Sequence, residues 1–156
     1  MPRLDQAIKE VHEEVINRIE EEIGDEEGLF KSEGIEIKDV IDGDRVRTKP
    51  AVPSIWVFGE PAEPEHTTSM RDTWTYPIML LGVVKDDNPD EGRHLSNTIA
   101  ALARSSVIKY QKGRRLGLNY VQDVRSGRFQ PSAEWLNEDN MYAAAALIEV
   151  IFLIKE

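Results

Sequence analysis

The last segment of the chain, Met141 to Glu156, is also its most apolar one, and a single charge, Glu149, interrupts the run that ends at Ile154. Chain termini usually fray, so a terminus of this composition must be docked against the rest of the molecule. The run is too short and too interrupted to span a bilayer. β-Branched residues and Phe152 dominate its second half, which predicts a strand from about Met141 rather than a helix.

Both faces of this predicted strand are apolar, so both need cover. A helix of the same chain can pack on one face, whereas the other face can be covered by a second subunit. Ile151 and Leu153 are therefore candidate residues of an interface between subunits.

Two segments carry apolar residues at steps of three and four, the pattern of amphipathic helices. The first covers residues 3 to 23, with Leu4, Val11 and Ile19 in its stripe, and Gly24 ends it. The second covers about Glu91 to Gln111, and Gly113 ends it. Asp90 or Glu91 supplies negative charge at the start of this second helix.

The remaining segments predict strands and connections. Residues 54 to 59 form a buried strand. Residues 73 to 85 alternate cleanly and form the central strand, in which Pro77 implies an edge or a bulge. The other expectations are a loop with one short strand near Ile35 to Val40 in Asp25–Pro53, an excursion from the sheet at Glu60–Asp72, a strand or hairpin at Asn119–Phe129, and a polar connection at Pro131–Asn140.

This order of elements predicts one domain, 1–156, of the α+β class: a largely antiparallel sheet of about four strands packed by two main helices. Its parts are the N-terminal amphipathic helix (1–24), an irregular and mobile segment (25–53), and the sheet with the second helix (54–156).

The net charge of −10 argues against a general affinity for nucleic acid. The charges are also separated along the sequence. Residues 1 to 28 hold ten acids and three bases, a balance of −7, whereas residues 104 to 128 hold seven bases and one acid, a balance of +6. Such separation is typical of solvated surfaces, and it would also orient identical subunits in a ring, with Arg114 and Arg115 at the contact.

No pattern of catalytic residues stands out. Glu63, Glu65 and His66 could contact a divalent ion but are better explained as an exposed loop, and we expect no cofactor and no metal. Because long excursions tend to carry contacts, these three residues and Arg71 are candidate residues of a subunit or partner interface. Glu36 to Lys38 spells an acid-x-Lys triplet and Pro89–Asp90 a Pro-Asp pair, but restriction-type nucleases have these two elements in the opposite order. The chain has no cysteine nucleophile and no Gly-x-Ser-x-Gly elbow. We therefore expect a protein that is not an enzyme.

The aromatic residues Trp56, Phe58, Trp74 and Tyr76 are expected in the core, because a base-stacking platform would need more nearby basic residues than Arg71. Trp135 lies in a polar connection and is a candidate interface residue. The charged N-terminus lacks the apolar core of a signal peptide, so we expect synthesis inside a cell.

The order of these elements resembles the tail-terminator and tail-completion proteins of long-tailed phages. The resemblance rests on the first helix, the strand at 54 to 59 with its Pro-rich continuation to Asp72, the strand from Trp74 to Val84, the helix at 91 to 111, and the terminal strand. It implies a virion protein of the neck, made in the host cytoplasm, that forms a homohexameric ring without a catalytic site.

The resemblance also implies partners: the tail tube protein, the head-tail connector protein, and DNA that passes through the lumen without specific binding, with no membrane involved. Carboxylates of the N-terminal segment, or those of Asp86, Asp87, Asp90 and Glu91, would line that lumen. The alternatives are another neck ring, namely a head-tail adaptor or stopper, a metal-dependent nuclease, and a cellular adaptor domain that forms no ring.

Overall fold

The computed structural model describes residues 2–43, 51–67, 72–109, 116–134 and 140–154. The described helices are α1 (Leu4–Gly24), α2 (Leu29–Ser32) and α3 (Pro89–Ile108). The strands are β1 (Asp39–Asp42), β2 (Ser54–Gly59), β3 (Glu63–Thr67), β4 (Asp72–Lys85), β5 (Val121–Glu134) and β6 (Met141–Ile154). None of the helices described is long and apolar enough to cross a membrane.

The strands form one sheet in the order β1-β2-β4-β6-β5, and β3 pairs with β4 beyond the end of β2. Every pair is antiparallel except β1 with β2. The predicted α+β class, the largely antiparallel sheet and the two main helices are confirmed. The sheet has six strands, where the sequence indicates about four, because β1 and β3 also join it.

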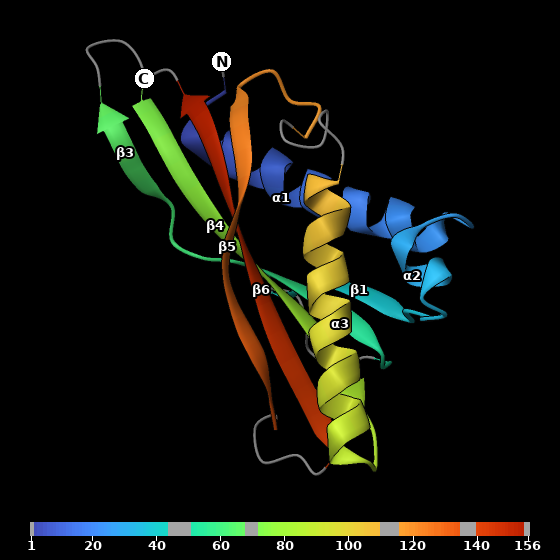
Figure 1. Cartoon of the computed structure of the whole chain (residues 1–156). Coiled ribbons are helices and arrows are strands. Elements are labelled where there is room, and N and C mark those ends of the chain that lie inside the picture. Colours follow the sequence, from blue (N-terminus) through green and yellow to red (C-terminus); the bar gives the residue numbers. More distant parts are fainter. Residues whose placement is uncertain (1, 44–50, 68–71, 110–115, 135–139, 155–156) are drawn as a thin grey trace.

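The helices pack on one face of this sheet, and Figure 1 shows α1 and α3 running in crossed directions, with α3 alongside β6. One core cluster joins Val11, Val15 and Ile19 of α1 to Ile99 of α3 and to alternate residues of β4 and β6. Gly82 of β4 lets α3 approach closely, because a Cβ there would lie 2.7 Å from the carbonyl oxygen of Ser96. We call this the helix face, and the opposite one the outer face.

The terminal segment is a strand, as its composition predicts. β6 pairs with β4 along its whole length and with β5 on its other side, so it lies inside the sheet. Its helix face packs on α3, where Ala144 and Ala146 meet Ala100. The small alanines of β6, which alone would suit a helix, allow this helix to lie close to the strand.

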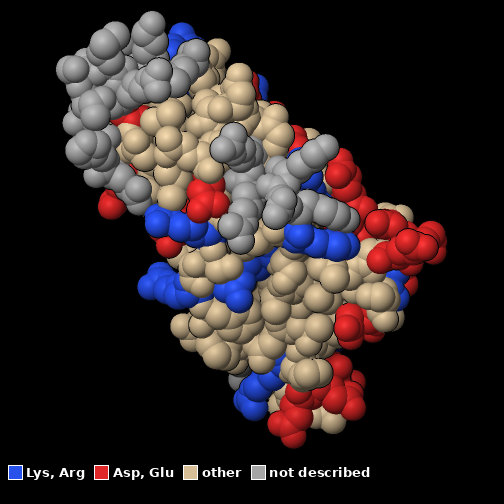
Figure 2. All heavy atoms as spheres, turned by 45° about the horizontal axis from the view of Figure 1, so that its top comes forward, with Lys and Arg blue, Asp and Glu red and all other residues tan. Residues whose placement is uncertain are grey.

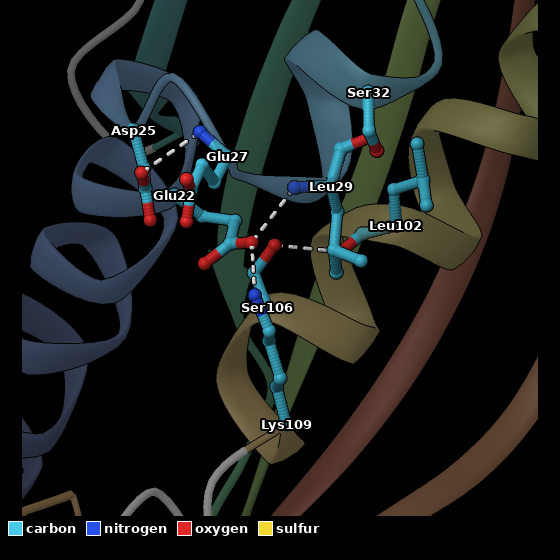
Figure 3. Close-up of polar contacts among 8 residues, drawn as sticks. All are labelled: Glu22, Asp25, Glu27, Leu29, Ser32, Leu102, Ser106 and Lys109. Atoms are coloured by element: carbon cyan, nitrogen blue, oxygen red, sulfur yellow. Dashed lines mark hydrogen bonds and ion pairs between the residues drawn. The ribbon is translucent and has the colours of Figure 1, made fainter.

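A buried carboxylate joins the three helices, as Figure 3 shows. Glu22 of α1 is 4% exposed, and its Oε1 accepts hydrogen bonds of 2.8 Å from the backbone N–H of Leu29 and from Nζ of Lys109. Leu29 is the first residue of α2, where helix N–H groups have no partner inside the helix. The sequence pattern of 25–53 predicts no helix, and this bond explains why one turn forms there.

The expected excursion from the sheet at Glu60–Asp72 is wrong, because Glu63–Thr67 forms β3 and continues the pairing with β4. Gly59 lies opposite Ile78 and Glu63 lies opposite Thr75. The chain therefore advances four residues where β4 advances three, and the extra residue forms a bulge. This bulge lies opposite Pro77, whose carbonyl accepts the N–H of Glu60. A proline has no N–H to donate toward that side, so the bulge predicted from Pro77 is confirmed.

Two other expectations need correction. The strand expected at Asn119–Phe129 is a single strand, not a hairpin, and it runs to Glu134, into the first part of the expected connection. It tolerates Pro131 because β5 is an edge strand and its pairing register shifts between Gln130 and Ala133. The second long helix begins at Pro89 rather than Glu91, because Asn88 caps it by accepting a 3.0 Å hydrogen bond from the N–H of Asp90.

Candidate interaction surface

The outer face of the sheet carries large apolar side chains that the helices do not cover. Alternation along β2, β4 and β6 places Trp56, Phe58, Met79, Leu81 and Leu147 on it, and all five are half-buried. The rings of Trp56 and Phe58 lie 6.0 Å apart. Large apolar side chains gathered on a sheet face without helix cover are typical of surfaces that bind another protein.

Register fixes these residues as one continuous surface, because Trp56 lies opposite Leu81 and Phe58 opposite Met79, while Leu147 lies opposite Met79 on the other side. The indole N–H of Trp56 donates a 3.0 Å hydrogen bond to Oγ of Ser54. That bond satisfies the polar end of the ring and holds it against the sheet. We define the apolar patch as Trp56, Phe58, Met79, Leu81 and Leu147.

The expectation that the four aromatic residues lie in the core holds for Tyr76, which is 5% exposed, and Trp74 packs against the core cluster. For Trp56 and Phe58 it is wrong, because their strand positions face away from the helices. The four central residues of Ser54 to Gly59 are all apolar, so the sequence does not indicate which face of this strand the helices cover.

The two candidate interface residues of the terminal strand both lie on the outer face. Leu153 is half-buried, whereas Ile151 is only 8% exposed. Leu153 is therefore accessible to a neighbouring subunit, whereas Ile151 is covered within its own chain.

Other candidate residues are dispersed or lie outside the described part. Glu63 is exposed on β3, and Glu65 and His66 follow it in the same strand, with side chains outside the described part. Arg71, Arg114, Arg115 and Trp135 fall outside the described residues. Within the described part of the chain, no group of His, Asp or Glu side chains could hold a metal ion.

The acidic candidates gather at one end of the molecule. Asp86 and Asp87 follow β4, and Asp90 and Glu91 lie in the first turn of α3. Figure 2 shows acidic side chains at this lower tip and along the right-hand edge. Asp86 accepts a 2.9 Å hydrogen bond from the N–H of Asn88, whereas Asp90 and Glu91 are exposed. We call these four residues the acidic tip.

The predicted charge separation is partly neutralised within the chain. Lys109 of the basic stretch pairs with Glu22 of the acidic one at 2.8 Å. Arg104 donates to the carbonyl of Gly127 at 3.1 Å, and its guanidinium lies 5.6 Å from the centre of the Phe129 ring. Arg128 remains exposed and carries no such contact among the described residues. Fewer charges of this stretch are therefore free for a partner than the sequence count indicates.

A second buried polar group lies between α1 and the sheet. Nδ1 of His12 lies 3.2 Å from the hydroxyl of Tyr76, and Nε2 lies 3.4 Å from a carboxylate oxygen of Asp42. The imidazole is 8% exposed, and nothing in its spacing in the sequence indicates these partners. Its contacts link α1 to β4 and β1, which explains a buried histidine on an otherwise apolar helix stripe.

No protein-family model matches the chain, and no curated protein matches it. Among solved structures, it is similar to a chain of the virion of a native gene transfer agent particle, with a TM-score of 0.48 and 9% sequence identity. The alignment covers 89% of this chain and 94% of that chain.

Proposed function

We propose that this chain is a structural subunit of a phage virion and assembles with copies of itself through the outer face of its sheet. The observation that carries the proposal is the apolar patch, which spans three neighbouring strands on the face that no described helix covers. Burying half-exposed aromatic and aliphatic side chains stabilises association by roughly 25 cal/mol per Å² of apolar surface removed from water.

The finer proposal is that the assembly is a homohexameric ring in the neck, the tail terminator or tail-completion ring, which caps the tail tube and contacts the head connector. The resemblance in the order of elements supports a ring of the neck, and a head-tail adaptor or stopper is the alternative. In such a ring the acidic tip lines the channel, and the subunit has no catalytic task.

The test compares the mass of the purified chain with that of two variants at high concentration, measured by light scattering. Leu81→Glu and Leu153→Glu put a charge on the outer face at half-buried positions, so they should give folded monomers, whereas the unchanged chain forms the ring. Ala101→Glu, at a half-buried position of α3 rather than on the outer face, is the matched control and should leave the ring intact.

Circular dichroism and thermal unfolding establish that each variant is folded. A ring that persists in both outer-face variants would show that this face is not the contact. An unchanged chain that stays monomeric at every concentration tested would overturn self-assembly itself.

A further inference from the structure

An open groove of about 390 Å³ lies at the bulge between β2 and β3, on the outer face. Pro61 and Pro64 line it, Pro77 and Leu147 contribute apolar surface from β4 and β6, and Thr75 of β4 lines it as well. The groove exists because three prolines fall where β3 takes over from β2 as the partner of β4. This place is separate from the apolar patch except at Leu147.

Four charged side chains surround the groove: Glu60, Glu63 and Glu149 with carboxylates, and Arg128 with a guanidinium. Three negative charges against one positive charge leave a balance of −2. Within the part of the chain that the structure describes, none of the four forms an ion pair or a side-chain hydrogen bond. An excess of carboxylates over cations favours a cationic partner.

Thr75 gives an independent indication of a missing partner. It is 7% exposed, and its hydroxyl oxygen is buried without a hydrogen-bond partner among the described groups. Buried hydroxyl groups are nearly always hydrogen-bonded in folded proteins, because leaving one unpaired costs free energy. A ligand group that donates a hydrogen bond in this groove would supply that partner.

We infer that the groove binds a lysine side chain of a partner protein. The aliphatic stem would lie on Pro77 and Leu147, and the ammonium would donate to the surrounding carboxylates and to Thr75. The carboxylates do not form a group that could hold a metal ion within the described residues, which favours an extended organic cation. One chain provides the whole groove, which shares only Leu147 with the apolar patch.

The experiment titrates the isotope-labelled full-length chain with N-acetyl-lysine methylamide and follows chemical shifts by NMR. The same titration with N-acetyl-norleucine methylamide provides the uncharged stem. The lysine probe should shift the signals of Thr75 and Leu147, and the norleucine probe should shift them several times less. Equal shifts with both probes, or no shift with either, would overturn the proposal.

Charge variants then give effects of opposite sign, which a folding defect would not produce. Glu63→Gln and Glu149→Gln should each weaken binding of the lysine probe by about two- to fivefold. Arg128→Gln removes the repelling charge and should tighten binding by a similar factor. Glu21→Gln, an exposed carboxylate of α1, is the matched control and should change nothing.

Thr75→Val tests the hydroxyl, because valine has nearly the shape of threonine without the polar atom. It should weaken binding of the lysine probe while the chain stays folded. Binding that is unaffected by Thr75→Val and weakened by Arg128→Gln would assign the shifts to a site other than this groove.

Discussion

At the scale of single residues, Tyr120 ties the first helix to the start of β5 and brings a tyrosine beside a carboxylate. It is 7% exposed, and its hydroxyl donates a hydrogen bond to Glu10. Burial raises the pKa of Tyr120 above its ordinary value of about 10, and the hydrogen bond and negative charge of Glu10 raise it further. The folded chain therefore holds this proton at pH values where the unfolded chain has lost it.

The sign of the pH dependence follows from this difference. Above pH 10 the unfolded state binds fewer protons at this position, so the free energy of unfolding falls as pH rises, by up to about 1.4 kcal/mol per pH unit. Below pH 10 this group contributes no slope. Urea unfolding at pH 9 to 11 checks the prediction, with Tyr120→Phe as the control. Equal alkaline slopes in the two proteins would contradict it.

At the scale of elements, Glu22 holds α1, α2 and α3 together through two bonds to one oxygen. Its side chain is 5% exposed and that of Lys109 is 30% exposed, so the carboxylate is the costlier group to leave unpaired. Glu22→Gln should lower the free energy of unfolding by about 1–3 kcal/mol. It should also speed amide hydrogen exchange at Leu29, whose N–H loses its charged acceptor.

The neighbouring Glu21 is exposed, and Glu21→Gln should change the free energy of unfolding by less than about 0.5 kcal/mol. Urea unfolding measures both values, and NMR follows the exchange at Leu29. Two variants with the same unfolding midpoint as the unchanged chain would mean that Glu22 does not join the helices.

Periodicity predicts the long elements because each one buries a stripe or a face that is visible in its own residues. α1, α3, β4 and β6 are of this kind. β3 is different, since Glu63 to Thr67 includes a proline and two acids and becomes a strand only because β4 offers a partner. One turn at Leu29 likewise depends on Glu22, seven residues earlier. The residues of β3 and α2 do not themselves indicate that β4 and Glu22 are their partners.

The candidate surface also has one part that the sequence predicts and one part that it does not. The apolar outer face of β6 is predictable, because both faces of that strand are apolar in the sequence. The groove is not, since Glu60, Arg128 and Glu149 come from three separate segments, which pairing in the sheet brings together. Pro61, Pro64 and Pro77 are the residues in the sequence that signal an irregularity at that place.

At the scale of the whole molecule, the charge of −10 is less informative about DNA than the position of each carboxylate. At physiological salt the Debye length is about 8 Å, so only charges near the path of the DNA repel its phosphates. In the proposed ring the acidic tip lies on that path, and the carboxylates of α1 do not. Reversing charge at the acidic tip and on α1 shows whether net charge or the position of the carboxylates governs contact with DNA.

Asp90→Lys together with Glu91→Lys changes the charge of the tip by four units per subunit, at exposed side chains in the first turn of α3. Glu20→Lys with Glu21→Lys makes the same change at exposed positions of α1. The first pair should give an assembled ring that retains a short DNA duplex, with binding that falls steeply as salt is raised. The second should bind it much more weakly, as fluorescence anisotropy of a labelled duplex would measure. Equal binding by the two variants would mean that net charge alone governs contact with DNA, and an α1 variant that binds more tightly would move the channel lining to that helix.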